Sequence, residues 1–122
     1  MNAVWSPRAI RHLTAIRKHI ERDSEGNAAV IAGRILDAIE LLCTQPQMGR
    51  PGRLAGTREL VVSGTPYIVP YRVRRERVEL LAVLDGRREL APVVPRLVNM
   101  VARTENRPFG SRLVVGVQNQ RG

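Results

Sequence analysis

The spacing of apolar residues changes about a third of the way along this chain, and that change constrains its fold more than any other feature. Apolar residues recur at helical spacing from Ile10 to Ile20 and again from Ala28 to Leu42. The polar run Asp23–Asn27 separates the two stretches. The sequence therefore predicts helices over about 7–22 and 27–44, and so short a connection favours an antiparallel hairpin.

Local signals define the outer ends of this hairpin. Ser6 suits an N-cap, and Pro7 suits the first helical position, where its missing N–H has no intrahelical partner to lose. Pro46 disfavours helical backbone at the residue before it. The second helix is therefore expected to end close to Thr44.

The rest of the chain reads as extended segments joined by turns. Residues 58–62, 67–73 and 78–84 are rich in β-favouring side chains, and residues 2–6 predict a short strand before the first helix. Pro70 removes one ladder donor and predicts an edge, a bulge or a kink. The expected order is β-α-α-β-β-β, an α+β fold with the helix hairpin packed on one face of an antiparallel sheet.

Length and cysteine content limit the class of protein. A chain of 122 residues with 43% hydrophobic residues can form one globular domain without metals or disulfides. Its single cysteine, Cys43, is expected to be a small buried residue, and it excludes an intramolecular disulfide. No stretch of sequence is long and apolar enough to span a membrane, and no signal-peptide pattern opens the chain. The expected compartment is the cytoplasm, without contact with a membrane.

Charge is concentrated in the second half of the chain. Residues 1–49 carry six basic and five acidic side chains, whereas residues 50–122 carry 14 arginines and six acidic residues. Lys18 is the only lysine among the 20 basic residues. Guanidinium groups can fork onto phosphates or carboxylates. The pattern predicts an anionic partner, either a nucleic acid or an acidic protein.

The usual catalytic constellations are not found in the sequence. His12 and His19 are expected on the solvated surface of the first helix, about 10 Å apart along its axis, too far for a shared metal. The run Gly49–Gly52 lacks the ending of a phosphate-binding loop, and there is no nucleophile elbow. No metal or cofactor is therefore expected. The arginines are therefore the main candidates for functional residues.

These arginines divide by position in the predicted sheet. The turn after the third strand lies at the opposite end of the sheet from the start of that strand, so it carries a separate group: Arg74, Arg75 and Arg77. Arg87 and Arg88 follow the last strand and are expected near the start of the third. Arg72 lies between the two groups, and Arg58 opens the second strand.

Five short segments, in this order, resemble the RelE/ParE superfamily of bacterial type II toxin–antitoxin toxins. They are Val4–Ala9, Pro46–Gly52, Gly56–Val62, Thr65–Val73 and Val83–Arg88. The superfamily has the small α+β fold already derived. The resemblance implies a toxin domain over residues 1–95 and an extension over 96–122. For the extension three alternatives stay open: a disordered tail, an element packed on the antitoxin or on a second toxin copy, and a relic of translational read-through.

The superfamily contains two branches with different targets. RelE-like toxins cleave mRNA on the ribosome with basic residues and a Tyr or His near the C-terminus, and here no Tyr or His follows Arg88. In that branch only Arg72 and Arg88 would serve as catalytic residues, and Asp85 stands where many relatives have His. ParE-like toxins, which inhibit DNA gyrase, resemble this chain more closely. The target-binding candidates are Arg58, Arg72, Arg87 and Arg88.

A cognate antitoxin is the partner that the resemblance implies. Such antitoxins are small DNA-binding proteins with an acidic, flexible C-terminal segment, so operator DNA would be reached only through the antitoxin. The antitoxin-binding candidates are Ile10, Leu13, Arg17, Arg74, Arg75 and Arg77. Gyrase inhibition is the preferred activity, and the alternatives are a ribosome-dependent mRNA endonuclease and a catalytically inactive, antitoxin-bound co-repressor.

Overall fold

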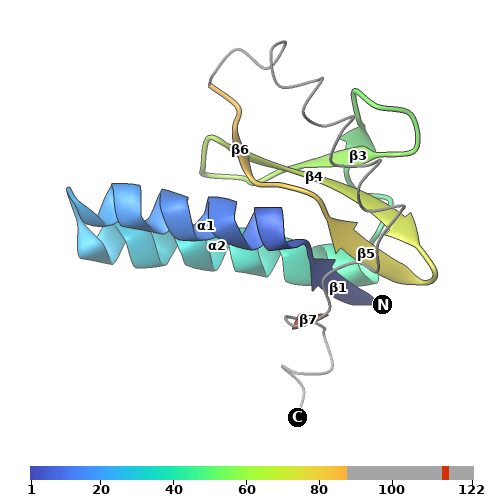
Figure 1. Cartoon of the computed structure of the whole chain (residues 1–122), viewed down its shortest axis with the longest axis horizontal. Coiled ribbons are helices and arrows are strands. Elements are labelled where there is room, and N and C mark those ends of the chain that lie inside the picture. Colours follow the sequence, from blue (N-terminus) through green and yellow to red (C-terminus); the bar gives the residue numbers. More distant parts are fainter. Residues whose placement is uncertain (88–113, 116–122) are drawn as a thin grey trace.

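The computed structural model describes residues 1–87 and 114–115. Its elements are β1 (Asn2–Trp5), α1 (Pro7–Glu21), α2 (Glu25–Thr44), β2 (Arg50–Pro51), β3 (Arg58–Val61), β4 (Tyr67–Arg74), β5 (Arg77–Leu80), β6 (Leu84–Asp85) and β7 (Val114–Val115). Figure 1 shows α1 and α2 side by side along one face of the sheet. The predicted α+β fold with a helix hairpin on a sheet is confirmed.

Serine side chains begin both helices. The Ser6 hydroxyl accepts a hydrogen bond from the Ala9 N–H at 3.0 Å, and Pro7 follows it at the first helical position, as predicted. The Ser24 hydroxyl accepts from the Asn27 N–H at 3.0 Å. Because Ser24 caps the second helix, α2 begins at Glu25, two residues before its predicted start.

The sheet is mixed rather than wholly antiparallel. Its strand order is β2-β3-β4-β5-β1-β7, and β6 pairs with β4. Neighbours from β2 to β5 are antiparallel, but β1 is parallel to β5, with Asn2 beside Arg77 and Trp5 beside Leu80. The predicted antiparallel pairing of the successive strands is confirmed for β3, β4 and β5, and the parallel pairing of β1 is the departure from an antiparallel sheet. Two helices follow β1, so no tight turn ties it to a neighbour, and a parallel pairing is available to it.

The predicted strand 78–84 is interrupted opposite Pro70. Tyr71 pairs with Leu80, and Ile68 pairs with Leu84. The three residues 81–83 therefore lie opposite the two residues 69–70 of β4. This is a bulge, one of the three outcomes predicted for Pro70. The Pro70 carbonyl still accepts a hydrogen bond from the Leu81 N–H at 2.9 Å. The interruption turns the chain so that β6 meets the first residues of β4.

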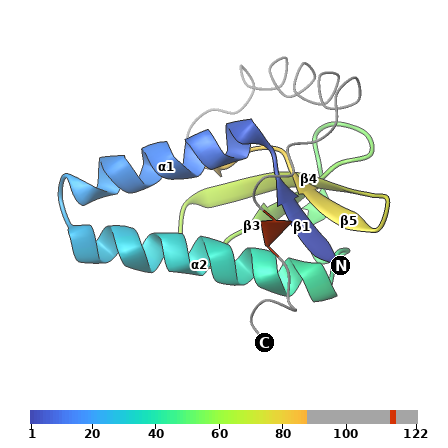
Figure 2. The ribbon, with the colours of Figure 1, turned by 60° about the horizontal axis from the view of Figure 1, so that its bottom comes forward.

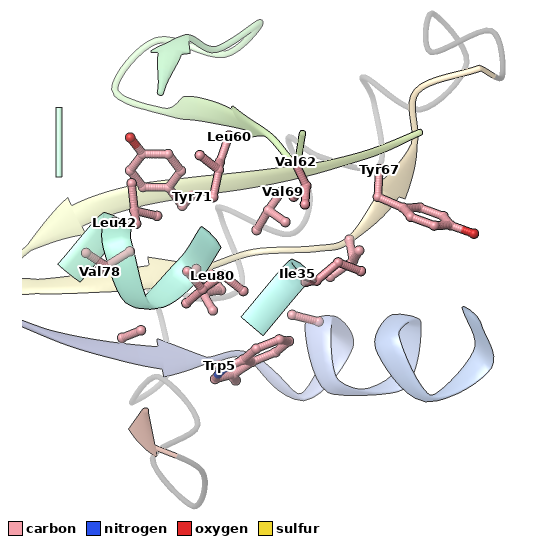
Figure 3. Close-up of a cluster of buried hydrophobic side chains, with 14 of the residues drawn as sticks. Trp5, Ile35, Leu42, Leu60, Val62, Tyr67, Val69, Tyr71, Val78 and Leu80 are labelled. Carbon is pink, nitrogen blue, oxygen red and sulfur yellow. The ribbon is translucent and has the colours of Figure 1, made fainter. Parts of the chain in front are cut away.

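The main core lies between the helices and the sheet (Figure 3). Its large, fully buried side chains are Trp5, Ile35, Ile39, Leu42, Val62, Val69, Tyr71, Val78 and Leu80. Strand side chains alternate between the two faces of a sheet. We call the face turned away from the helices the distal face; it carries Glu59, Pro70, Arg72 and Glu79, which alternate with the core residues in register.

Tyr71 ties the end of α2 to the centre of the sheet. Its hydroxyl donates to the Pro46 carbonyl at 2.8 Å and accepts from the Gly49 N–H at 3.0 Å. A Cβ atom at residue 49 would lie 2.5 Å from that hydroxyl, so the contact requires glycine there. Burial raises the pKa of the Tyr71 phenol, which therefore stays protonated and keeps its donor.

Replacing Tyr71 by Phe removes both hydrogen bonds and leaves the Gly49 N–H and the Pro46 carbonyl without them. We expect the free energy of unfolding to fall by about 1–3 kcal/mol, measured by urea denaturation. Tyr67→Phe is the matched control, because in the described part of the chain the Tyr67 hydroxyl makes no hydrogen bond. Equal losses in the two variants would contradict this role for Tyr71.

Candidate functional site

Glu79 is a buried carboxylate on the distal face, held by two arginines. Its Oε1 accepts from the Arg72 Nε at 2.7 Å, and its Oε2 accepts from Arg77 at 2.9–3.0 Å. Arg72 and Glu79 face each other across β4 and β5, and their side chains are only 5% and 3% exposed. A buried charge requires a partner of opposite sign. Arg72 is therefore part of the internal structure of the sheet.

Glu59 forms a second centre of the same kind on β3. Its carboxylate binds the Arg50 guanidinium at 3.1 Å, and it also accepts from the Arg53 N–H at 3.2 Å. The Arg53 guanidinium lies 3.7 Å from the same carboxylate. Arg58 donates to the Gly49 carbonyl at 2.7 Å, so its side chain also serves the connection between α2 and β3.

The structure does not bring together the three target-binding candidates that it describes, Arg58, Arg72 and Arg87. Arg58 shares the face of its register partner Tyr71, whereas Arg72 lies on the distal face. Arg87 lies beyond β6, at the opposite end of β4 from the β4–β5 turn, as predicted. Its guanidinium is exposed and binds Asp85 at 2.9 Å, a hydrogen-bonded pair that raises the pKa of Arg87. Arg88 lies outside the described residues.

The β4–β5 turn and the strand ends beside it carry three arginines close together. Arg74 and Arg77 lie directly opposite each other, and the turn residues Arg75 and Glu76 have φ angles of 52° and 59°. Left-handed backbone at two consecutive residues with side chains is unfavourable, since such turns prefer Asn and Gly. Within residues 1–87, the Arg74 and Arg75 side chains form no ion pair. We call Arg74, Arg75 and Arg77 the hairpin tip.

The α1 candidates for antitoxin binding lie far from the hairpin tip. Ile10 and Leu13 are half-buried and pack against the main core, and exposed Arg17 lies 3.9 Å from Glu21. β1 begins beside Arg77 and ends beside Leu80, immediately before α1. One partner would have to extend along the length of the sheet to touch both groups.

His12 is not the solvated histidine that the sequence predicted. Its Nδ1 accepts a hydrogen bond from the Val83 N–H at 3.2 Å, where the chain passes from β5 to β6. Burial lowers the pKa of His12 below the ordinary 6.5, and the neighbouring Arg8 and Arg11 lower it further. His19 is exposed as predicted, and Cys43 is buried as predicted. Burial raises the pKa of the Cys43 thiol, so it is a poor nucleophile.

Among residues 1–87 and 114–115, no three His, Cys, Asp or Glu side chains are grouped so that they could hold a metal ion. In the same part of the chain, neither helix has the length and apolar character needed to span a bilayer.

The sequence interpretation missed the roles of Glu59, Glu79 and Tyr71. A signal was present for the two glutamates, because each is an isolated acidic residue inside a strand of β-favouring residues. A carboxylate at such a position predicts cations on the neighbouring strands. For Tyr71 the signal was weaker, since a tyrosine inside a strand is ordinary.

The helix hairpin packed on a small mixed sheet matches the fold of the RelE/ParE superfamily of toxins. The sequence matches the family model described as ParE toxin of type II toxin-antitoxin system, parDE, over residues 3–90. The chain therefore belongs to the ParE toxin family.

Individual relatives agree with this assignment. The chain is 42% identical over 90 residues to "Putative toxin Y4kP" of Sinorhizobium fredii, covering 74% of this chain and 93% of the relative. It is 36% identical over 85 residues to "Toxin RelE2" of Caulobacter vibrioides, covering 70% and 94%. A solved structure titled "Chromosomal ParDE TA system from P. aeruginosa" has the same fold, with a TM-score of 0.62, 24% identity, and coverage of 68% of this chain and 92% of that one.

The contact between His12 and Val83 makes stability depend on pH. Because the pKa of His12 is lower in the folded state than the ordinary 6.5, the unfolded chain takes up the proton first as the pH falls. The contribution is fully present above pH 6.5 and is lost as the pH falls toward the folded-state pKa. Urea denaturation at a series of pH values should show this decline in the wild type and in His19→Gln, but not in His12→Gln. A decline of the same size in His12→Gln would refute the assignment.

Proposed function

We propose that this toxin acts by inhibiting DNA gyrase and not by cleaving mRNA. The observation that supports this proposal is the state of Arg72. A ribonuclease site needs cations free to stabilise the negative charge that develops on a phosphate. Arg72 is instead buried and bound to Glu79, so its charge is already neutralised within the fold.

Two acid–base groups of the described residues, His12 and Tyr71, already take part in hydrogen bonds within the fold. His12 uses its Nδ1 to accept from the Val83 N–H, and the Tyr71 hydroxyl is bound on both sides by backbone groups. General acid–base catalysis requires a proton-transferring group that can reach the substrate. The match to the ParE family model adds support, whereas the relative named "Toxin RelE2" makes mRNA cleavage the outcome to test against.

On this proposal the purified chain, free of antitoxin, inhibits supercoiling by gyrase and leaves ribosome-bound mRNA intact. Arg87→Ala should weaken the inhibition, because Arg87 is the exposed target-binding candidate at the β6 end of the sheet. Arg22→Ala, which removes another exposed arginine just beyond α1, is the matched control. Cleavage of mRNA at defined codon positions, with supercoiling unaffected, would contradict the proposal.

We also propose that a cognate antitoxin neutralises the toxin through an acidic segment that binds the hairpin tip. Arg72, Arg74, Arg75 and Arg77 are accompanied by two carboxylates, Glu76 and Glu79, so positive charge is still in excess by two. Like charges directly opposite each other on paired strands repel. An acidic segment would relieve that repulsion and form charge-assisted hydrogen bonds. Ile10 and Leu13 then serve as apolar anchors at the far end of the sheet, and Arg17 lies beside them.

The remaining parts of the proposal follow from the family. Operator DNA is contacted only through the antitoxin, and the toxin works in the cytoplasm, where gyrase lies. The toxin domain occupies residues 1–95, which contain the whole of the family match at 3–90. Of the extension 96–122, the structure describes β7, which pairs with β1 through Ala3 and Val4.

The turn at the hairpin tip allows stability and binding to be separated. Replacing Arg75 by Asn suits the left-handed backbone and removes only the guanidinium, so the free energy of unfolding should rise by up to about 1 kcal/mol. Binding to the antitoxin should nevertheless weaken roughly tenfold, equivalent to about 1.4 kcal/mol, because the exposed guanidinium is lost. Its salt dependence should also become shallower.

Calorimetric titration with the antitoxin measures both effects, and Arg11→Ala, on the solvated side of α1, is the matched control. A more stable variant that binds the antitoxin as tightly as wild type would exclude the hairpin tip from the interface.

A further inference from the structure

The exposed side of α2 carries apolar residues that the toxin fold does not use. Large exposed hydrophobic side chains of the described residues include Val30, Leu36 and Leu41 on α2, and none lies on α1. Val30 is 53% exposed and Leu41 is 46% exposed. Figure 2 shows α2 at the margin of the fold, with α1 and the sheet on one side of it. Within residues 1–87, no helix or strand covers the other side of α2.

Four residues form a continuous seam on this open side. Val30, Arg34, Asp37 and Leu41 follow one another at intervals of four, three and four residues. These are the intervals of the a and d positions of a coiled coil, which keep side chains on one side of a helix. All four are exposed, and the core residues Ile35, Ile39 and Leu42 lie on the opposite side.

The order of the four residues makes the seam complementary to the same seam on a second, antiparallel copy of α2. In an antiparallel pair of identical helices related by a two-fold axis, residue i faces residue j and j faces i. An axis midway between Arg34 and Asp37 places Arg34 opposite Asp37 of the second copy. The same axis places Val30 opposite Leu41. Each seam then pairs its charges with opposite charges and its apolar residues with apolar residues.

The two charged residues of the seam are available for such pairing. Within residues 1–87, neither Arg34 nor Asp37 takes part in an ion pair. In the monomer the Arg34 guanidinium lies beside Gly64 in the turn between β3 and β4, so this side chain has to turn away from Gly64 to reach Asp37 of the second copy. Gly33, on the flank of the seam, has no atom within 4 Å of where its Cβ would be, so a second helix can approach closely there.

From these features we propose that the toxin forms an antiparallel homodimer through the α2 seam. Four side chains per copy make an interface smaller than the roughly 800 Å² per partner of a standard complex. The dimer is therefore weak, with a dissociation constant in the micromolar range or above, and it strengthens wherever an assembly holds two toxins together. This inference does not depend on the target of the toxin.

Sedimentation equilibrium of the full chain across the micromolar to millimolar range tests the association. The wild type should show a monomer–dimer equilibrium, and Asp37→Arg should weaken it about tenfold, because Arg34 would face a second arginine. Arg34→Asp combined with Asp37→Arg should restore the wild-type affinity, since the seam is then complementary again. A wild type that stays monomeric throughout, or a double variant no better than Asp37→Arg, would overturn the proposal.

Cross-linking with a short bismaleimide tests the antiparallel arrangement. Val30→Cys combined with Leu41→Cys should give a covalent dimer, because these positions face each other across the axis. Val30→Cys alone should not, because its two copies would lie about 16 Å apart along the helix axis. The wild type, with only the buried Cys43, gives the background. Efficient cross-linking of Val30→Cys alone, or protection of the seam only when the antitoxin is bound, would contradict a homodimer of this form.

Discussion

Burying a carboxylate is unfavourable by several kcal/mol unless cations neutralise it, and this chain buries two on the distal face of its sheet. Glu79 binds Arg72 and Arg77, and Glu59 binds Arg50 and Arg53. Both glutamates occupy central strands, so their arginine partners are drawn from the turns and strands around them. The two ion-pair groups hold the β-meander in register and connect it to the chain that leaves α2. They also neutralise several guanidinium groups, although only Arg72 among them is buried.

Many of the residues that carry the family resemblance stabilise the same part of the fold, the β-meander and its connection to α2. Pro46 and Gly49 meet the hydroxyl of Tyr71, and Arg58 donates to the carbonyl of Gly49. A family pattern made of such residues identifies a fold with high specificity and an activity with much less. The partner-binding surfaces lie elsewhere, at the hairpin tip and along the exposed side of α2. Each surface has a locally unfavourable feature: left-handed backbone at the hairpin tip and exposed apolar side chains on α2.

Local sequence patterns predicted most of the fold. They could not predict contacts between residues that are distant in the sequence. Apolar spacing and the cap at Ser6 defined the helices, because both act within a few residues. The parallel pairing of β1 with β5 joins residues more than 70 positions apart, which no local pattern encodes. Arg72 looked available for the same reason, since its partner Glu79 appears only when the register of β4 and β5 is known. His12 likewise looked solvated until the chain after β5 was seen to pass beside it.

The division between arginines held inside the fold and arginines left for partners is the central physical claim, and side-chain NMR of the arginine Nε–H groups measures it directly. In the free toxin the Nε–H of Arg72, which donates to Glu79, should exchange slowly with water, whereas those of Arg74 and Arg75 should exchange rapidly. Addition of the antitoxin should slow exchange at Arg74 and Arg75 and leave Arg72 unchanged. Rapid exchange at Arg72 in the free protein, or a response to the antitoxin at Arg72 alone, would contradict the division.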